Sequence, residues 1–181
     1  MSGVERFHVI TGGPGSGKTS LIEALARAGY ARTVEAGRAI IQDQLAIDGP
    51  ALPWRDPLAF AELMLSWELR SYRLAEAAAG PVFFDRGVTD LVGYLTLIGR
   101  PVPPHVARAA ERFRYNRRAF VAPPWPEIYA QDTERKQTLE EAVRTYEALV
   151  AAYSSCGYEL VSLPLVSVEE RVSFVLGEIG V

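Results

Sequence analysis

Gly12-Gly13-Pro14-Gly15-Ser16-Gly17-Lys18-Thr19, near the start of the chain, fits the pattern G-x-x-x-x-G-K-[ST]. This pattern is typical of a P-loop, a turn between a strand and a helix that binds phosphate. The apolar residues 7–10 precede it and predict a buried parallel strand. Apolar residues at helical spacing follow it and predict a helix: Leu21, Ile22, Leu25 and Ala26. The sequence therefore predicts a nucleotide-binding site, whereas the alternative is a glycine-rich turn that carries Lys-Thr by chance.

The residue types in this turn suit the phosphates of ATP. Glycines let successive backbone N–H groups point inward around a phosphate, where a Cβ atom would block the approach. A helix that begins near Gly17 adds the positive end of its dipole. The Lys18 ammonium can reach the β- and γ-phosphates, and the Thr19 hydroxyl can hold Mg²⁺. We therefore expect ATP and Mg²⁺ as cofactors, with ATP bound by Gly12, Gly13, Pro14, Gly15, Ser16, Gly17, Lys18, Thr19 and Ser20.

The composition is that of a soluble globular chain, and it narrows the possible partners. The 181 residues favour a single domain over residues 1–181. The net charge of −3 argues against a nucleic-acid partner, which would need a basic face. One cysteine, Cys156, excludes an internal disulfide and suits a reducing cytoplasm. The polar residues 1–6 lack the apolar core of a signal peptide, and no apolar run is long enough to span a bilayer, so we expect a cytoplasmic protein without a membrane partner.

Strand and helix patterns alternate along the chain. This alternation is typical of an α/β fold, in which a parallel sheet has helices on both of its faces. Strands are predicted at residues 7–10, 31–35, 81–84, 119–121 and 159–162. Beyond the P-loop helix, helices are predicted at residues 38–46, from Asp56-Pro57 to Gly80, at 88–98, at 105–115, at 138–155 and after Ser167. The fold expected from these patterns is a three-layer sandwich around a five-stranded parallel sheet.

Asp85 and Arg86 directly follow the third predicted strand. At the carboxyl end of a strand, Asp85 would lie beside the P-loop and could hold the Mg²⁺ shell, although it could instead cap the next helix. ATP-hydrolysing machines usually place a glutamate after this aspartate, but here the next residue is Arg86. Arginine can neutralise charge on a transferring or accepting group, so the pair favours phosphoryl transfer.

Glu35 and Arg38 follow the second predicted strand, at the same edge of the sheet. A carboxylate at this edge could accept the proton of an acceptor hydroxyl, which makes Glu35 a candidate catalytic base. Arg38 and Arg86 would join Glu35 in binding the acceptor. The alternative is a glutamate that merely favours the start of a helix through the helix dipole.

Residues 123–137 are rich in proline and polar residues and predict an irregular surface segment. Arg135 and Lys136 could fold over the triphosphate as a lid, with Asp132 nearby, and Arg135 is then a further candidate catalytic residue. The alternative is a solvated loop. Among the aromatic residues, Trp54, Phe60 and Trp67 could stack on a ring-shaped substrate, although aromatic residues at helical spacing more often belong to a core.

Several of these stretches together resemble P-loop kinases of the nucleoside and nucleotide kinase branch. More closely, the chain resembles a bacterial family often labelled "AAA family ATPase", whose relatives include nicotinamide riboside kinases. The resemblance rests on Val34-Glu35-Ala36-Gly37-Arg38, Phe84-Asp85-Arg86-Gly87, Pro124-Trp125 with Asp132 and Arg135, and Tyr158-Glu159-Leu160-Val161. It implies the sheet order 2-3-1-4-5, a Mg-ATP donor, Glu35 or Asp85 near the acceptor, and Arg135 in the lid.

Two functions of different classes are compatible with these residues. The first is a small-molecule kinase that passes the γ-phosphoryl group of ATP to a nucleoside- or nucleotide-like acceptor. The second is an ATP-hydrolysing or ATP-sensing protein that acts on a protein partner. The residue after Asp85 and the absence of a Leu-Ser-Gly-Gly signature favour the kinase.

Overall fold

The computed structural model describes residues 3–129 and 138–181, and these form a three-layer α/β fold around one sheet. The strands are β1 (Phe7–Gly12), β2 (Ala31–Arg32), β3 (Val82–Asp85), β4 (Arg118–Ala122) and β5 (Glu159–Ser162). They are all parallel and lie in the order β2-β3-β1-β4-β5. The expected fold class and strand order are therefore confirmed. Because β1 lies at the centre, the turn that follows it opens at the middle of the sheet's carboxyl edge.

Seven α-helices connect and cover the strands in the described part of the chain. They are α1 (Lys18–Arg27), α2 (Ala36–Ala46), α3 (Pro57–Ala75), α4 (Val88–Leu97), α5 (Pro104–Arg112), α6 (Leu139–Ser155) and α7 (Val168–Ile179). Two short 3-10 helices are η1 (Gly3–Arg6) and η2 (Pro126–Ile128). Side chains fix several helix starts: Asp56 accepts a hydrogen bond from the Ala59 N–H, and Thr138 and Ser167 each begin a capping box. None of the described helices has the length and apolar character needed to cross a membrane.

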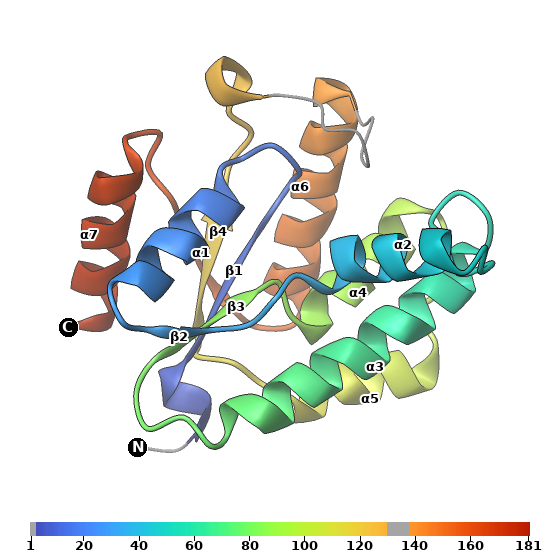
Figure 1. Cartoon of the computed structure of the whole chain (residues 1–181), viewed down its shortest axis with the longest axis horizontal. Coiled ribbons are helices and arrows are strands. Elements are labelled where there is room, and N and C mark those ends of the chain that lie inside the picture. The colour runs from blue at the N-terminus through green and yellow to red at the C-terminus, as the bar shows by residue number, and fades with distance from the viewer. Residues whose placement is uncertain (1–2, 130–137) are drawn as a thin grey trace.

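The two faces of the sheet bury separate apolar clusters. On one face, α1 and α7 pack over Ile10, Phe83 and Phe120. On the other, Phe7 and Val9 lie under residues of α3 and α6. Figure 1 shows α1 and α7 together on one side of the sheet and α6 on the other. Strand β1 is buried along its whole length because helices cover both faces, as is usual for a central parallel strand.

The second strand is shorter than its sequence pattern predicts. It was expected at residues 31–35, but β2 ends at Arg32. The Thr33 N–H still donates to the Phe83 carbonyl (2.9 Å), whereas the Asp85 N–H donates to the Thr33 hydroxyl (3.1 Å) instead of to a backbone carbonyl. This side-chain bond ends the ladder. Glu35 is therefore not the last residue of a strand but the residue before α2.

Two helices are also shorter than predicted. The helix expected from Asp56-Pro57 to Gly80 is α3, which ends at Ala75. The expected helix at residues 105–115 ends at Arg112. Tyr115 is fully buried beyond it, where its hydroxyl accepts a hydrogen bond from the Val88 N–H (3.1 Å) and its own N–H donates to the Tyr158 hydroxyl (3.3 Å). These tertiary contacts replace the helical bonds that the periodicity favoured.

Candidate functional site

The P-loop connects β1 to α1, as predicted. The Lys18 ammonium lies against the loop itself, 2.5 Å from the Gly13 carbonyl oxygen and 3.2 Å from the Ser16 hydroxyl. Ser16 in turn donates to the Gly13 carbonyl (2.8 Å). These hydrogen bonds connect the two ends of the loop between Gly13 and Lys18. Thr19 and Ser20 are exposed in the first turn of α1.

The glycines of the loop are needed for packing as well as for phosphate access. Gly15 has φ +69°, and a Cβ built there would lie 2.5 Å from the ring of Tyr129. A Cβ on Gly13 would lie 2.5 Å from the Ala142 carbonyl oxygen at the start of α6. These contacts are a second reason for glycine at these positions, whereas the obstruction of phosphate by a Cβ stays a prediction. The segment containing Tyr129 and the first turn of α6 both pack directly on the loop.

Asp85 ends β3 opposite Ile10, directly beside the P-loop. One of its carboxylate oxygens, Oδ1, is buried and has no hydrogen-bond partner among the described residues. Burial and the nearby Glu35 carboxylate together raise the pKa of Asp85 to about 6, against the lowering effect of the Lys18 charge. A buried oxygen without a partner is a suitable Mg²⁺ ligand, and the exposed Thr19 hydroxyl is a second one. The residues present at this point therefore fit the predicted metal, although the described residues contain no cluster of three or more acidic, histidine or cysteine side chains of the kind that would hold a metal.

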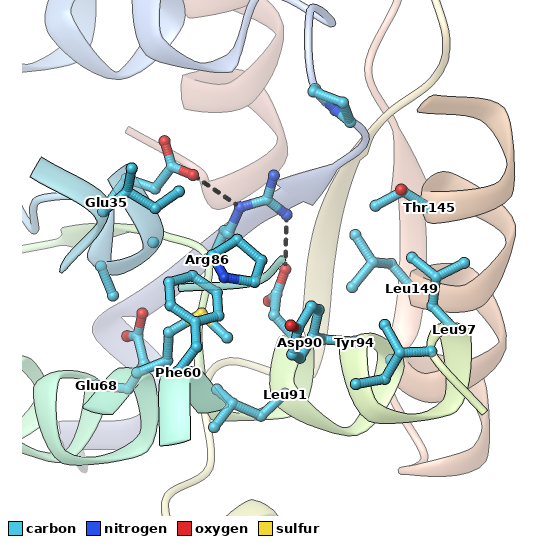
Figure 2. A pocket seen from close by; sticks show the side chains of 18 of the residues that line it. Glu35, Phe60, Glu68, Arg86, Asp90, Leu91, Tyr94, Leu97, Thr145 and Leu149 are labelled. Atoms are coloured by element: carbon cyan, nitrogen blue, oxygen red, sulfur yellow. Dashed lines mark hydrogen bonds and ion pairs between the residues drawn. The ribbon is translucent and has the colours of Figure 1, made fainter. Parts of the chain in front are cut away.

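Arg86 turns the chain sharply after β3. Its φ is +69°, a left-handed conformation that is rare for a residue with a side chain and is concentrated at functional sites. Its guanidinium lies between two carboxylates, with Nε 3.4 Å from Glu35 Oε1 and Nη1 3.2 Å from Asp90 Oδ1 (Figure 2). All three side chains are largely shielded from water. Glu35 and Arg86 were both predicted as site residues, and the fold brings them together across 51 positions of sequence.

Asp90 is a residue that the sequence analysis missed. Its two carboxylate oxygens accept four hydrogen bonds: Oδ1 from Thr11 (2.6 Å) and Arg86, and Oδ2 from the Gly87 N–H (3.0 Å) and the Tyr153 hydroxyl (2.6 Å). A carboxylate four residues after Arg86 on a predicted helix was a usable signal, because residues at that spacing face each other. Asp90 thus fixes Arg86 to β1, α4 and α6.

A cavity of about 620 Å³ lies beside this ion-pair cluster. Pro14 of the P-loop, Glu35 and Arg86 form part of its wall, so the cavity adjoins the P-loop. Most of the remaining lining is apolar, and it includes Phe60 and Tyr94, whose rings meet edge to face at 5.8 Å. Of the three candidate stacking residues, Trp54 and Phe60 line the cavity, whereas Trp67 instead packs beside a core cluster. Arg38, predicted to bind the acceptor, is not among the lining residues.

A buried carboxyl group on α3 also lines the cavity. Glu68 of α3 is only 3% exposed, and Figure 2 places it beside Phe60 and below Glu35. Burial raises the pKa of Glu68 well above its ordinary range, and the negative charges of Asp90, Asp85 and Glu35 raise it further. No sequence pattern indicates this burial, because a single glutamate within an amphipathic helix usually faces solvent.

The described part of the expected lid packs against the P-loop and α7. Trp125 is stacked on the guanidinium of Arg171, 4.5 Å from ring centre to Cζ. Arg171 is 1% exposed and donates to the carbonyls of Ser16 and Pro164, both at 2.8 Å. Arg171 of α7 therefore supports the P-loop from behind, which no local pattern indicated. The predicted lid residues Asp132, Arg135 and Lys136 lie outside the described residues.

A family model described as an AAA domain (AAA_28) matches residues 7–171 of this sequence. The chain belongs to the AAA_28 family. This bears out the resemblance to an "AAA family ATPase" group that was drawn from its motifs. No protein with curated function matches the sequence significantly.

Solved structures of kinases share the fold of this AAA_28 chain. NadR in complex with NR superimposes with a TM-score of 0.75 and 19% identity, over 98% of this chain and 52% of NadR. A deoxyadenosine kinase from M. mycoides, with dCMP and dCDP bound, has a TM-score of 0.69 and 11% identity, over 96% of this chain and 98% of the kinase. A thymidylate kinase from Ehrlichia chaffeensis superimposes with a TM-score of 0.63 and 14% identity, over 98% of this chain and 99% of the kinase. The AAA_28 chain spans about half the length of NadR but nearly the whole of the other two kinases, and it has the fold of P-loop nucleoside and nucleotide kinases.

Proposed function

We propose that this protein is a cytoplasmic P-loop kinase that transfers the γ-phosphoryl group of ATP to a hydroxyl group of a small, nucleoside-like acceptor. The observation that carries the proposal is the cavity of about 620 Å³ next to the P-loop, with Glu35 and Arg86 in its wall. A hydrolase needs room only for water, whereas a transferase needs an acceptor site that meets the phosphate site. The acceptor class is suggested by the NR and dCMP that two structures of similar fold contain.

Each end of the site has a separate task in this proposal. Residues 12–20 hold the triphosphate, and Lys18 moves from the Gly13 carbonyl onto the β- and γ-phosphates. Thr19 and the unpartnered oxygen of Asp85 hold Mg²⁺, which supplies charge neutralisation at the phosphates. Arg86, anchored by Glu35 and Asp90, is aimed at the transferring group.

Glu35 is the proposed base. It lines the cavity, whereas Asp85 lies outside the lining and beside the P-loop. In the reaction an acceptor oxygen attacks the γ-phosphorus, the bond between that phosphorus and the β–γ bridging oxygen breaks, and the acceptor proton passes to Glu35. ADP leaves with the bridging oxygen. Arg135 remains the proposed lid residue on the basis of the motif resemblance alone.

The test compares ADP formation with and without candidate acceptors. Glu35→Gln keeps the shape of the side chain and removes its basicity. We expect it to lower acceptor-dependent turnover by roughly 10²–10⁴-fold and to leave ATP affinity nearly unchanged. Glu23→Gln, an exposed change on α1, is the matched control and should behave like the native protein.

Two results would decide against this assignment. If Glu35→Gln abolishes ADP formation in the absence of any acceptor, Glu35 activates water and the protein is a hydrolase. If it changes neither activity, Glu35 only precedes a helix, and Asp85 becomes the candidate base.

A further inference from the structure

The cavity wall carries more acidic than basic groups. Four carboxylic side chains line it: Glu35, Glu68, Asp90 and Glu141. Arg86 is the only basic side chain among the described lining residues, and it is already paired with Glu35 and Asp90. An acceptor that brought a phosphate into this cavity would add about two negative charges to an acidic site without a second cation in the described wall. The charge balance therefore disfavours a nucleotide as the acceptor.

Glu68 differs from the other three carboxylic groups. Glu35 and Asp90 are bound to Arg86, and Glu141 accepts a hydrogen bond from the Thr138 N–H (2.6 Å) at the start of α6. Glu68 makes no hydrogen bond with the described residues, although it is 3% exposed and lines the cavity among apolar side chains. Buried carboxyl groups are nearly always hydrogen-bonded, so an unpaired one at a cavity wall points to a ligand.

We propose that Glu68 is a specificity-determining residue that binds a hydrogen-bond donor, such as an amino or amide group, on the ring of an acceptor that carries no phosphate. The inference rests on the proposed function, because it assigns the acceptor to this cavity. The acceptor ring lies along Phe60 and Tyr94, and its hydroxyl end points toward Glu35 and the P-loop. A positive charge on the ring would strengthen binding, since the cluster around Arg86 has an excess of carboxylates.

The experiment measures binding by calorimetry and turnover by ADP formation for matched probes. Cytidine carries an amino group where uridine has a carbonyl beside a ring N–H, adenosine and inosine differ in the same way, and a pyridinium riboside adds a ring cation. The corresponding 5′-monophosphates test the exclusion of phosphate. We expect the amino or cationic member of each pair to bind more tightly, and the monophosphates to bind at least tenfold more weakly.

Glu68→Gln is the test variant, and Glu62→Gln, an exposed glutamate on the same helix, is the matched control. We expect Glu68→Gln to raise KM about 10- to 100-fold for the preferred probe, to change kcat much less, and to reduce the preference within each pair. Glu68→Met, which replaces a buried acid by an apolar side chain of similar length, should stay folded by thermal melting and lose the same preference.

The outcomes separate this inference from the proposed function. Unchanged selectivity in folded Glu68→Gln and Glu68→Met, or a preference for monophosphates, overturns the role of Glu68 while the kinase proposal stands. Binding that depends on Glu68 without any ADP formation supports the role of Glu68 and overturns the kinase. If none of the probes binds, the assignment of the cavity to such an acceptor is wrong, and the inference falls.

Discussion

Replacing Asp90 by asparagine should both destabilise the protein and misplace Arg86. The carboxylate is 8% exposed and accepts hydrogen bonds from Thr11, Arg86, Gly87 and Tyr153. Asparagine keeps one acceptor oxygen and puts an NH₂ group in place of the other. Hydroxyl groups can rotate to accept from that NH₂, but the Arg86 guanidinium and the Gly87 N–H can only donate. Whichever way the amide is oriented, one donor is left facing another donor.

The magnitude follows from the lost contacts. A buried donor left without a partner costs about 1–3 kcal/mol, and removing one member of a buried ion pair costs about 3–5 kcal/mol. Because Glu35 still faces Arg86, we expect the lower part of that range for Asp90→Asn, about 3 kcal/mol in the free energy of unfolding. Tyr153→Phe removes only one of the four donors and keeps the charge, so it should cost about 1–2 kcal/mol.

Urea denaturation of the two variants and the native chain measures these differences. Turnover is then measured without urea at a low temperature, where the variant is folded. Asp90→Asn should still be at least tenfold slower than the native protein, since Arg86 loses one of its two anchors. Tyr153→Phe is the control, because it perturbs the same carboxylate without touching the ion pair. A loss below 1 kcal/mol for Asp90→Asn, or a larger loss for Tyr153→Phe, would refute the reasoning.

Three further predictions concern the P-loop and the core. Lys18→Ala should abolish phosphoryl transfer and weaken Mg-ATP binding with the fold retained, and calorimetry that finds native affinity would remove the site assignment. Arg171→Met should lower the free energy of unfolding in urea by about 3 kcal/mol and weaken ATP binding, because the carbonyls of Ser16 and Pro164 lose a charged donor. Native stability of this variant would show that the contact is dispensable. Burial lowers the pKa of His8 from 6.5 to about 4. Between pH 6.5 and 4 the unfolded chain therefore binds a proton more readily than the folded chain. The free energy of unfolding should fall as the pH decreases through this range, by up to about 3 kcal/mol. His8→Phe should lose this part of the pH dependence in unfolding curves at pH 4, 5, 6 and 7, and equal slopes for the two proteins would contradict the assignment.

Local patterns were sufficient for most of the architecture. Residues 7–29 carry the strand, the phosphate-binding turn and the helix in one continuous stretch, and each is encoded by neighbouring residues. The helix starts at Asp56, Thr138 and Ser167 were predictable for the same reason, since a capping side chain bonds to a backbone N–H three residues later. The strand order 2-3-1-4-5 came from the family resemblance, because periodicity does not say which strands are neighbours.

The candidate site was predictable only where it follows a strand directly. Asp85 ends β3 and Arg86 follows it, so the rule that ligands bind at the carboxyl edge of a parallel sheet predicted their position at that edge. Glu35 was placed near Arg86 for a partly wrong reason, since its strand ends at Arg32 and the start of α2 brings it into position. The Thr33 hydroxyl that ends the ladder acts across 52 positions, beyond the reach of any local pattern.

Tertiary packing alone placed the remaining site residues. Glu68 faces the cavity because α3 lies against α2 and α4, and a helical pattern does not specify how a helix is rotated against neighbours that are distant in sequence. Arg171 reaches Ser16 across 155 positions, and Tyr153 reaches Asp90 across 63. The sequence by itself determined the phosphate-binding turn and the alternation of strands and helices, because backbone hydrogen bonds and side-chain periodicity are local. The shape and charge of the cavity beside the P-loop depend on which helix faces meet, and only the packed structure decides that.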